Sequence, residues 1–183
     1  NVISGNVGST GSAARGGIYI AATNTIIRGN LIGTDVSGSN LIANGQSAVG
    51  NSAGIFITGY SGTIIGGTAA YAGNTIAGNY GDGILINASG STNTILGNSI
   101  YSNSEQGIDL ASDDGITYND VLDSDTGANA LQNFPILKSA TSSGGDSTIT
   151  GKMVGVASTT FRIEFFKNSH GQADTSGYGE ARV

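Results

Sequence analysis

Short apolar runs, each flanked by Asn or Gly, recur along the first 110 residues of the chain. One kind reads GIxI or close to it, at 17–20, 54–57, 83–86 and 107–110. A second contains TII or TIL, within 25–30, 62–67 and 93–98. A third has the form NxI followed by a polar turn, at 1–6, 30–35, 74–79 and 98–103. These runs predict β-strands, because they are short and β-branched and because Gly costs about 1 kcal/mol inside a helix.

The three kinds of run follow one another in a fixed order, so each cycle holds three strands. The cycle from Gly83 to Gly107 spans 24 residues, and the two cycles before it span 29 and 37. The additional residues fall at turns, within 6–17, 35–54 and 67–74, which are rich in Gly, Ser and Ala. Insertions confined to turns are typical of solenoids, in which each coil needs only its strands to stack. Three strands in a turn of about 22 to 24 residues is the pattern of a right-handed parallel β-helix.

The phrases NVISGN, GIxI and NTIxGNxI resemble the repeats of right-handed parallel β-helix proteins of the bacterial cell surface, in the pectate-lyase-like superfamily. The resemblance covers about residues 1–134, and its motif residues are structural, so it implies the fold more directly than the function. We therefore expect an all-β chain with about four coils. The resemblance also implies an extracellular or cell-surface location. Since no signal-peptide pattern is present, we expect an export signal to lie outside this sequence.

Alternate side chains of a strand share one face, which assigns the inward positions. The GIxI strands place Ile84 and Ile108 in the bore, and the other two walls receive the Ile residues at 27, 64 and 95 and at 3, 32, 76 and 100. Asn residues recur at the corners, where left-handed turns and amide stacking suit them. We expect one structural ladder through Asn1, Asn30, Asn74 and Asn98, and a second through Asn6, Asn79 and Asn103, with Asp35 in the same register.

The positions between the inward residues of the GIxI strands predict an outward column that could form a binding surface. Its members are Tyr19, Phe56, Leu85 and Asp109. Exposed apolar patches often mark contacts. Two interpretations stay open: a carbohydrate stacks on the aromatic rings, or the insertion at 36–53 or another protein covers the column.

Acidic residues near the same strands allow an enzymatic interpretation. Asp82, Glu105 and Asp109 could form the carboxylate pair that glycoside hydrolysis needs. The resemblance to pectate lyases would add a calcium-binding acidic cluster and an Arg or Lys base. The coils offer only Arg15 and Arg28, and neither lies in a recognisable lyase motif. We therefore expect no catalytic residues and keep this trio as the alternative.

The stretch 109–129 contains about half of the acids in the chain. Asp120, Asp123 and Asp125 offer carboxylate oxygens at short spacings and are followed by a Gly, as in calcium-binding loops. No Glu follows at the distance found in EF-hands. Two interpretations stay open: a capping loop held by ordinary Asx turns, and a structural Ca²⁺ site with these three residues as its ligands. The lone His170 lies in a polar stretch without a second His or any Cys, so we expect a loop residue rather than a zinc ligand.

From residue 135 to 183 the pattern changes to longer strands with period-two alternation, for example around Phe161, Ile163 and Phe165. Turn-rich gaps separate these strands, which predicts antiparallel hairpins. With the preceding phrase ALQNFPIL at 130–137, this segment resembles the opening strands of an immunoglobulin-like module. About 50 residues are too few for seven strands. We expect either a cap on the last coil or an incomplete domain. The chain also begins directly on a repeat, so we expect it to be part of a longer solenoid or to meet another copy.

Composition narrows the function. The net charge of −6 and a pI near 4.4 disfavour binding to nucleic acid. No apolar run is long enough for a membrane span. The Thr residues do not form the regular TxT array that ice binding would need. We expect a non-catalytic, structural or adhesive extracellular β-helical module whose partners are a polysaccharide or like subunits end to end. The alternative is a polysaccharide lyase or glycoside hydrolase.

Overall fold

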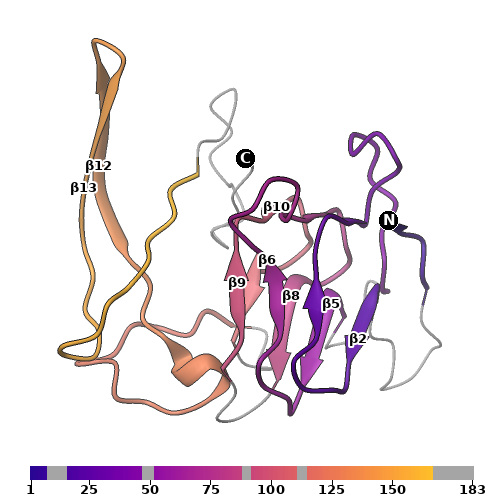
Figure 1. Cartoon of the computed structure of the whole chain (residues 1–183), viewed down its shortest axis with the longest axis horizontal. Helices are drawn as coiled ribbons and strands as arrows, with labels where there is room; N and C mark the ends of the chain where they lie inside the picture. Colours follow the sequence, from indigo (N-terminus) through magenta and orange to yellow (C-terminus); the bar gives the residue numbers. More distant parts are fainter. Residues whose placement is uncertain (8–15, 47–51, 88–91, 111–114, 167–183) are drawn as a thin grey trace.

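The computed structural model describes residues 1–7, 16–46, 52–87, 92–110 and 115–166 (Figure 1). Four residues of the sequence analysis lie outside the described residues: Arg15, His170, and Asp113 and Asp114 of the acidic stretch 109–129. Within the described residues the regular secondary structure is β-strand apart from one short 3₁₀ helix, η1 (Ala128–Leu131). No described helix has the length and apolar character needed to cross a membrane.

Three parallel sheets form the walls of the coils, and each wall receives one strand from each coil. The first sheet has the order β1-β4-β7-β10, and the second has the order β11-β8-β5-β2. The third has the order β3-β6-β9. The strands of the first wall are β1 (Val2–Ile3), β4 (Leu31–Ile32), β7 (Thr75–Ala77) and β10 (Ser99–Tyr101). Those of the second are β2 (Ile18–Ile20), β5 (Ala53–Thr58), β8 (Asp82–Asn87) and β11 (Ile108–Asp109). Those of the third are β3 (Ile26–Ile27), β6 (Ile64–Gly66) and β9 (Thr94–Leu96). This arrangement confirms the predicted parallel β-helix with three strands per coil.

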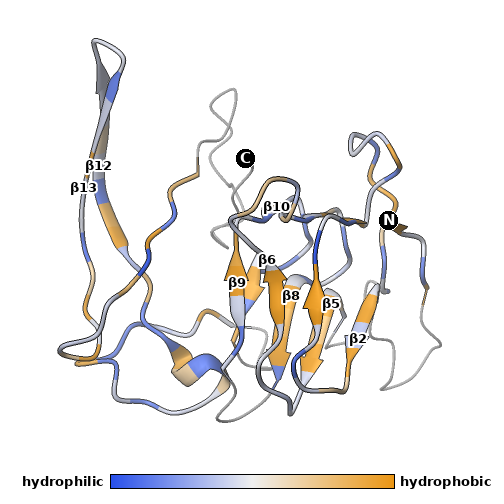
Figure 2. Ribbon diagram, in the orientation of Figure 1, coloured by the Kyte–Doolittle hydropathy of each residue, from blue (hydrophilic) through white to orange (hydrophobic). Residues whose placement is uncertain are grey.

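The core is an Ile ladder that runs through the bore. Ile55, Ile84 and Ile108 are register partners in the second wall, and the strands appear as apolar arrows in Figure 2. Ile55 and Ile84 are fully buried, which confirms the predicted inward face. Ile108 is aligned as predicted but is 42% exposed, because β11 is the last strand of its sheet. Burying one such side chain contributes about 1.5–3 kcal/mol.

One inward position of the third wall was predicted wrongly. Ile65, not Ile64, pairs with Ile27 and Ile95 and is fully buried, whereas Ile64 pairs with Ile26 on the outer face. Adjacent Ile residues look equivalent in a sequence, but a register shift of one residue exchanges the two faces of a strand.

Two ladders of Asn side chains follow two corners of the coils. In the first, the Nδ2 atom of Asn30 donates to Asn74 Oδ1 at 3.0 Å, and that of Asn74 donates to Asn98 Oδ1 at 2.9 Å. The backbone N–H groups of Asn30 and Asn74 donate to the same two oxygens, both at 3.0 Å. The predicted ladder is therefore confirmed, and it satisfies backbone groups that the turns leave unpaired.

The second ladder corrects the prediction for Asp35. Its rungs are Asn6, Asn44, Asn79 and Asn103, joined by Nδ2-to-Oδ1 bonds of 2.9, 2.8 and 2.9 Å. Asn44, from the insertion, occupies the place assigned to Asp35. Asp35 instead starts an exposed loop, where its carboxylate accepts bonds from the Ser37 hydroxyl and the Asn40 amide. Those bonds lower the pKa of Asp35 to about 2.

Close stacking of the coils needs Gly at some corners. Gly33 and Gly66 have φ values of 88° and 83°, in the left-handed region that Gly adopts without strain. A Cβ atom at either position would overlap the carbonyl oxygen of the next coil, that of Ala77 or Leu96. Neither position therefore accepts a larger residue without moving the neighbouring coil.

After the coils, β12 (Ile136–Ser143) and β13 (Asp146–Lys152) form an antiparallel hairpin that projects from the body of the molecule (Figure 1). Every residue of the hairpin is exposed. The antiparallel pairing confirms the prediction for this segment. The strand predicted from the alternation near Phe161–Phe165 is not formed, since residues 153–166 are irregular.

Candidate metal site and cavity beyond the last coil

The loop at residues 120–133, called the Asp-rich loop below, is closed by two Asn side chains that form hydrogen bonds with the backbone. Asn119 and Phe134 exchange two bonds, from Asn119 Nδ2 to the Phe134 carbonyl at 2.8 Å and from the Phe134 amide to Asn119 Oδ1 at 2.9 Å. Buried Asn133 accepts from the Asp120 amide at 2.9 Å and donates to the Asp120 carbonyl at 3.0 Å. These four bonds join Asn119 to Phe134 and Asp120 to Asn133, and so hold the two ends of the loop together.

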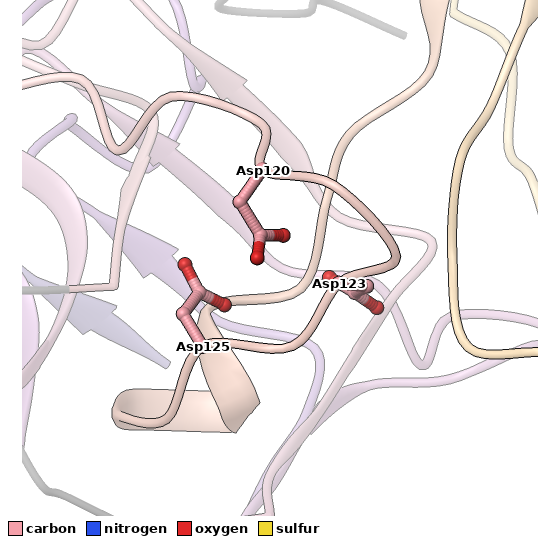
Figure 3. Close-up of side chains that lie close together, drawn as sticks. All are labelled: Asp120, Asp123 and Asp125. Atoms are coloured by element: carbon pink, nitrogen blue, oxygen red, sulfur yellow. The ribbon is translucent and has the colours of Figure 1, made fainter.

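Three carboxylates converge inside this loop (Figure 3). One oxygen atom from each of Asp120, Asp123 and Asp125 lies within 4.8 Å of the other two. Oxygen ligands lie about 2.3–2.6 Å from a bound Ca²⁺, so two of them can be at most about 5.2 Å apart. The spacing of the three carboxylates therefore fits a single ion between them. The structure brings together all three residues that the sequence predicted as ligands.

The three carboxylates are not equally satisfied by the protein. Asp120 accepts bonds at one oxygen from the Ser124 amide and hydroxyl, at 3.0 and 2.9 Å, and the amide bond is the main cause that lowers its pKa. Asp123 accepts the Asn133 amide at 2.7 Å. The Oδ1 atom of Asp125, in contrast, is buried without a hydrogen-bond partner. Leaving a buried carboxylate oxygen unpaired is costly, and a cation would remove that cost.

The loop contains two consecutive residues with left-handed backbone. Leu122 and Asp123 have φ values of 68° and 56°. Non-Gly residues adopt this region rarely, at a cost of about 1–2 kcal/mol each. Two consecutive residues of this kind indicate that the surrounding contacts over-determine the loop conformation.

The same loop leads into a cap on the third corner of the coils. Within the coils, the Thr63 amide donates to Asn93 Oδ1 at 2.9 Å. At the next level, the Asn93 amide donates to Asn129 Oδ1 at 2.8 Å, and Asn129 Nδ2 donates back to the Asn93 carbonyl at 2.9 Å. Asn129, in η1, thus takes the place of the next rung. No sequence pattern predicted this role, because Asn129 lies outside the repeat.

A cavity of about 690 Å³ lies between the last coil and the segments that follow it. Ile95, Ile100 and Ile108 form its wall on the side of the coils, and Phe134 and Phe166 contribute from the other side. Glu164 fixes the returning chain, since its Oε2 atom accepts a 2.8 Å bond from the Gly97 amide. The sequence reasoning missed this cavity, which depends on where an irregular segment meets the coils.

The three acids of the enzymatic interpretation do not form an open catalytic pair. Asp82 and Asp109 are 2% and 1% exposed, and Asp82 Oδ1 accepts the Gln106 amide at 2.9 Å. Asp109 is the register partner of Leu85, three residues beyond Asp82 on β8, so the two acids are offset by about 10 Å along the strands. Glu105 is partly buried, and its amide bonds to the Gly81 carbonyl.

The predicted outward column is in register but is not an exposed surface. Tyr19, Phe56 and Leu85 are consecutive partners across the second wall, followed by Asp109. Phe56, Leu85 and Asp109 are buried, and Ala53 packs with the first two in a small second core. Large apolar side chains gain stability when covered, which explains their burial. Only Tyr19 remains accessible, at 51%, and its ring stacks on Phe56 with centroids 5.7 Å apart.

Comparison with known proteins finds no matching family model, no similar curated protein and no similar solved structure. The parallel β-helix is therefore established from the chain's own repeats and strand register.

Proposed function

We propose that this chain is a non-catalytic, structural or adhesive extracellular module, related to the β-helical surface proteins of the pectate-lyase-like superfamily. The observation that carries the proposal is the burial of Asp82 and Asp109, because a glycosidase needs carboxylates that reach its substrate. The Asn ladders support the same interpretation, since hydrogen bonds between coils account for these side chains.

We propose that a polysaccharide would bind against the side chain of Tyr19. Its exposed ring is supported from below by buried Phe56, which holds it as a fixed platform. An aromatic face of this kind suits the apolar face of a sugar ring, because it offers a large and rigid apolar surface.

A panel of glycans, assayed both for binding and for cleavage, tests this function. Binding is measured on immobilised acidic and neutral polysaccharides, and cleavage is measured as new reducing ends and unsaturated products in solution. We expect retention on at least one glycan, loss of retention in Tyr19→Ala, and no cleavage. Ile64→Ala, on the outer face of another wall, serves as the matched control. Cleavage that is lost in Asp109→Asn would establish the polysaccharide-active alternative instead.

We also propose that Asp120, Asp123 and Asp125 bind a structural Ca²⁺. The convergence of their oxygens and the buried, unpartnered Oδ1 of Asp125 support this assignment. The ion would hold the loop that positions Asn129 against the last coil. It has no part in a reaction, and the glycan proposal does not depend on it.

The melting temperature as a function of Ca²⁺ tests the metal proposal. For a dissociation constant near 1 mM, typical of extracellular calcium modules, 10 mM Ca²⁺ adds about 1.4 kcal/mol. For a domain of this size that raises the melting temperature by about 3–6 °C. Asp125→Asn should abolish the shift, whereas Asp146→Asn, an exposed acid of the hairpin, should leave it unchanged. An equal shift with Mg²⁺, or none with either ion, would contradict the proposal.

A further inference from the structure

We propose that the cavity beyond the last coil binds a small amphiphile that has an apolar body and one anionic group. The cavity volume of about 690 Å³ lies within the range of about 300–1,000 Å³ that is usual for small-molecule sites. The site is separate from the carboxylate cluster and from Tyr19, and the inference stands independently of the proposed function.

The wall formed by the coils is the open end of the Ile ladder. Ile95 and Leu110 pack against the buried core on one side and line the cavity on the other, and exposed Ile108 lines it beside them. Within the coils, this position above an Ile rung is filled by the Ile of the next coil. The surface is therefore shaped for aliphatic groups, and covering it gains about 25 cal/mol for each Å² removed from water.

The opposite wall adds aromatic and aliphatic groups from three separate segments. Ile116 precedes the Asp-rich loop, Phe134 and Leu137 follow it, and Phe166 comes from the returning chain. Phe134 and Phe166 are exposed, at 46% and 39%, although they face this cavity. An apolar ligand would cover both rings, and it would do so without any change in the coils.

The charge at the cavity selects an anionic group. Both carboxylate oxygens of Glu164 are occupied, Oε1 by Arg162 Nε at 3.0 Å and Oε2 by the Gly97 amide at 2.8 Å. Arg162 uses only Nε in this contact, so its terminal guanidinium nitrogens remain available among the described residues. Arginine forms strong paired bonds to carboxylates and other planar anions. The charge of Glu164 is balanced by Arg162 in this pair, so the remaining N–H donors of the guanidinium favour an anionic partner.

Calorimetric titration with decanoate and with uncharged decanol tests the proposal on the whole chain. We expect one saturable decanoate site and at least tenfold weaker binding of decanol. Arg162→Gln should weaken decanoate about tenfold and leave decanol unchanged. Ile108→Trp, which places a larger ring in the cavity, should abolish binding of both. Lys152→Gln on the hairpin, outside the cavity, removes a positive charge and should change neither.

Leu137→Asp provides a second variant that leaves the coils intact, because Leu137 lies on the exposed strand β12. It should abolish decanoate binding by placing a negative charge at the cavity. Circular dichroism verifies the fold of each variant. Absence of saturable decanoate binding to the folded wild type would overturn the proposal. Equal binding of decanoate and decanol would refute the anionic selectivity. A dimer in sedimentation that Leu137→Asp dissociates would assign the cavity to a second copy of the chain and so overturn the proposal.

Discussion

Replacing Asn74 by Ala should be among the most destabilising changes at any polar residue of this chain. The Asn74 side chain is buried and takes part in four hydrogen bonds. Its Oδ1 atom accepts from the amide and the Nδ2 atom of Asn30, both at 3.0 Å. Its Nδ2 atom donates to the Ile27 carbonyl at 3.0 Å and to Asn98 Oδ1 at 2.9 Å. The substitution removes all four bonds and leaves the buried Asn30 amide without a partner.

The magnitude follows from these contacts. A hydrogen bond contributes about 0.5–1.5 kcal/mol net, so four bonds contribute about 2–6 kcal/mol, with about 4 as the central value. Asn1 occupies the exposed end of the same ladder, and its side chain donates once, to Asn30 Oδ1 at 3.2 Å. Asn1→Ala should therefore cost about 1 kcal/mol or less. The expected difference between the two variants is about 3 kcal/mol.

Urea unfolding measures this difference. With a slope near 2 kcal/mol per molar urea, the midpoint of Asn74→Ala should fall by about 2 M, and that of Asn1→Ala by less than about 0.5 M. Asn74→Asp gives a further test, because its carboxylate would face two acceptors, the Ile27 carbonyl and Asn98 Oδ1, and part of its cost should disappear when acid protonates it. Equal midpoint shifts for the two Ala variants would refute the argument that the ladder stabilises the coils.

Three further outcomes follow from the structure. Ile84→Asp places a charge in the fully buried ladder and should cost more than about 4 kcal/mol in urea unfolding, whereas Ile26→Asp, 59% exposed, should cost about 0.5 kcal/mol or less. Asp35 should titrate near pH 2 in a carboxyl-resolved NMR titration, and a midpoint near 3.8 would contradict the loop contacts. Because the pKa of Asp35 is lower in the folded state than in the unfolded state, its contribution to stability is present above pH 4 and is lost as the pH falls toward 2. Asn129→Ala should speed hydrogen exchange at the Asn93 amide, while unchanged exchange there would exclude the cap.

The fold could be predicted from the sequence because the same interactions recur in every coil. Ile84 and Asn74 each have counterparts one period away, so a repeat in the sequence corresponds to a repeat in space. The positions of Ile64 and Asp35 were predicted wrongly because the local amino-acid sequence does not determine strand register. Two adjacent Ile residues differ only in which face they occupy, and the insertion that supplies Asn44 moves the rung nine residues along the chain.

The candidate site was predictable only in part. The spacing of Asp120, Asp123 and Asp125 indicated the cluster, because all three acids lie in one short loop. Asn133 and Asn129, which hold the loop and join it to the coils, have no periodic counterpart. The outward column was correctly aligned, but the burial of Phe56 and Leu85 depends on tertiary packing, including their contacts with Ala53. Non-repeating contacts of this kind are decided by tertiary structure.

The unidirectional hydrogen bonding of the Asn ladder makes each coil an interchangeable part. Every rung offers its oxygen to the preceding coil and its amide to the following one, so the two ends of any period are chemically complementary. Excising residues 75–98 would remove one full period of 24 residues and leave Asn74 followed by the sequence that now follows Asn98. Asn74 would then stand where Asn98 stands now, still joined to Asn30. Protein engineers could therefore shorten or lengthen this solenoid in whole periods without redesigning its core.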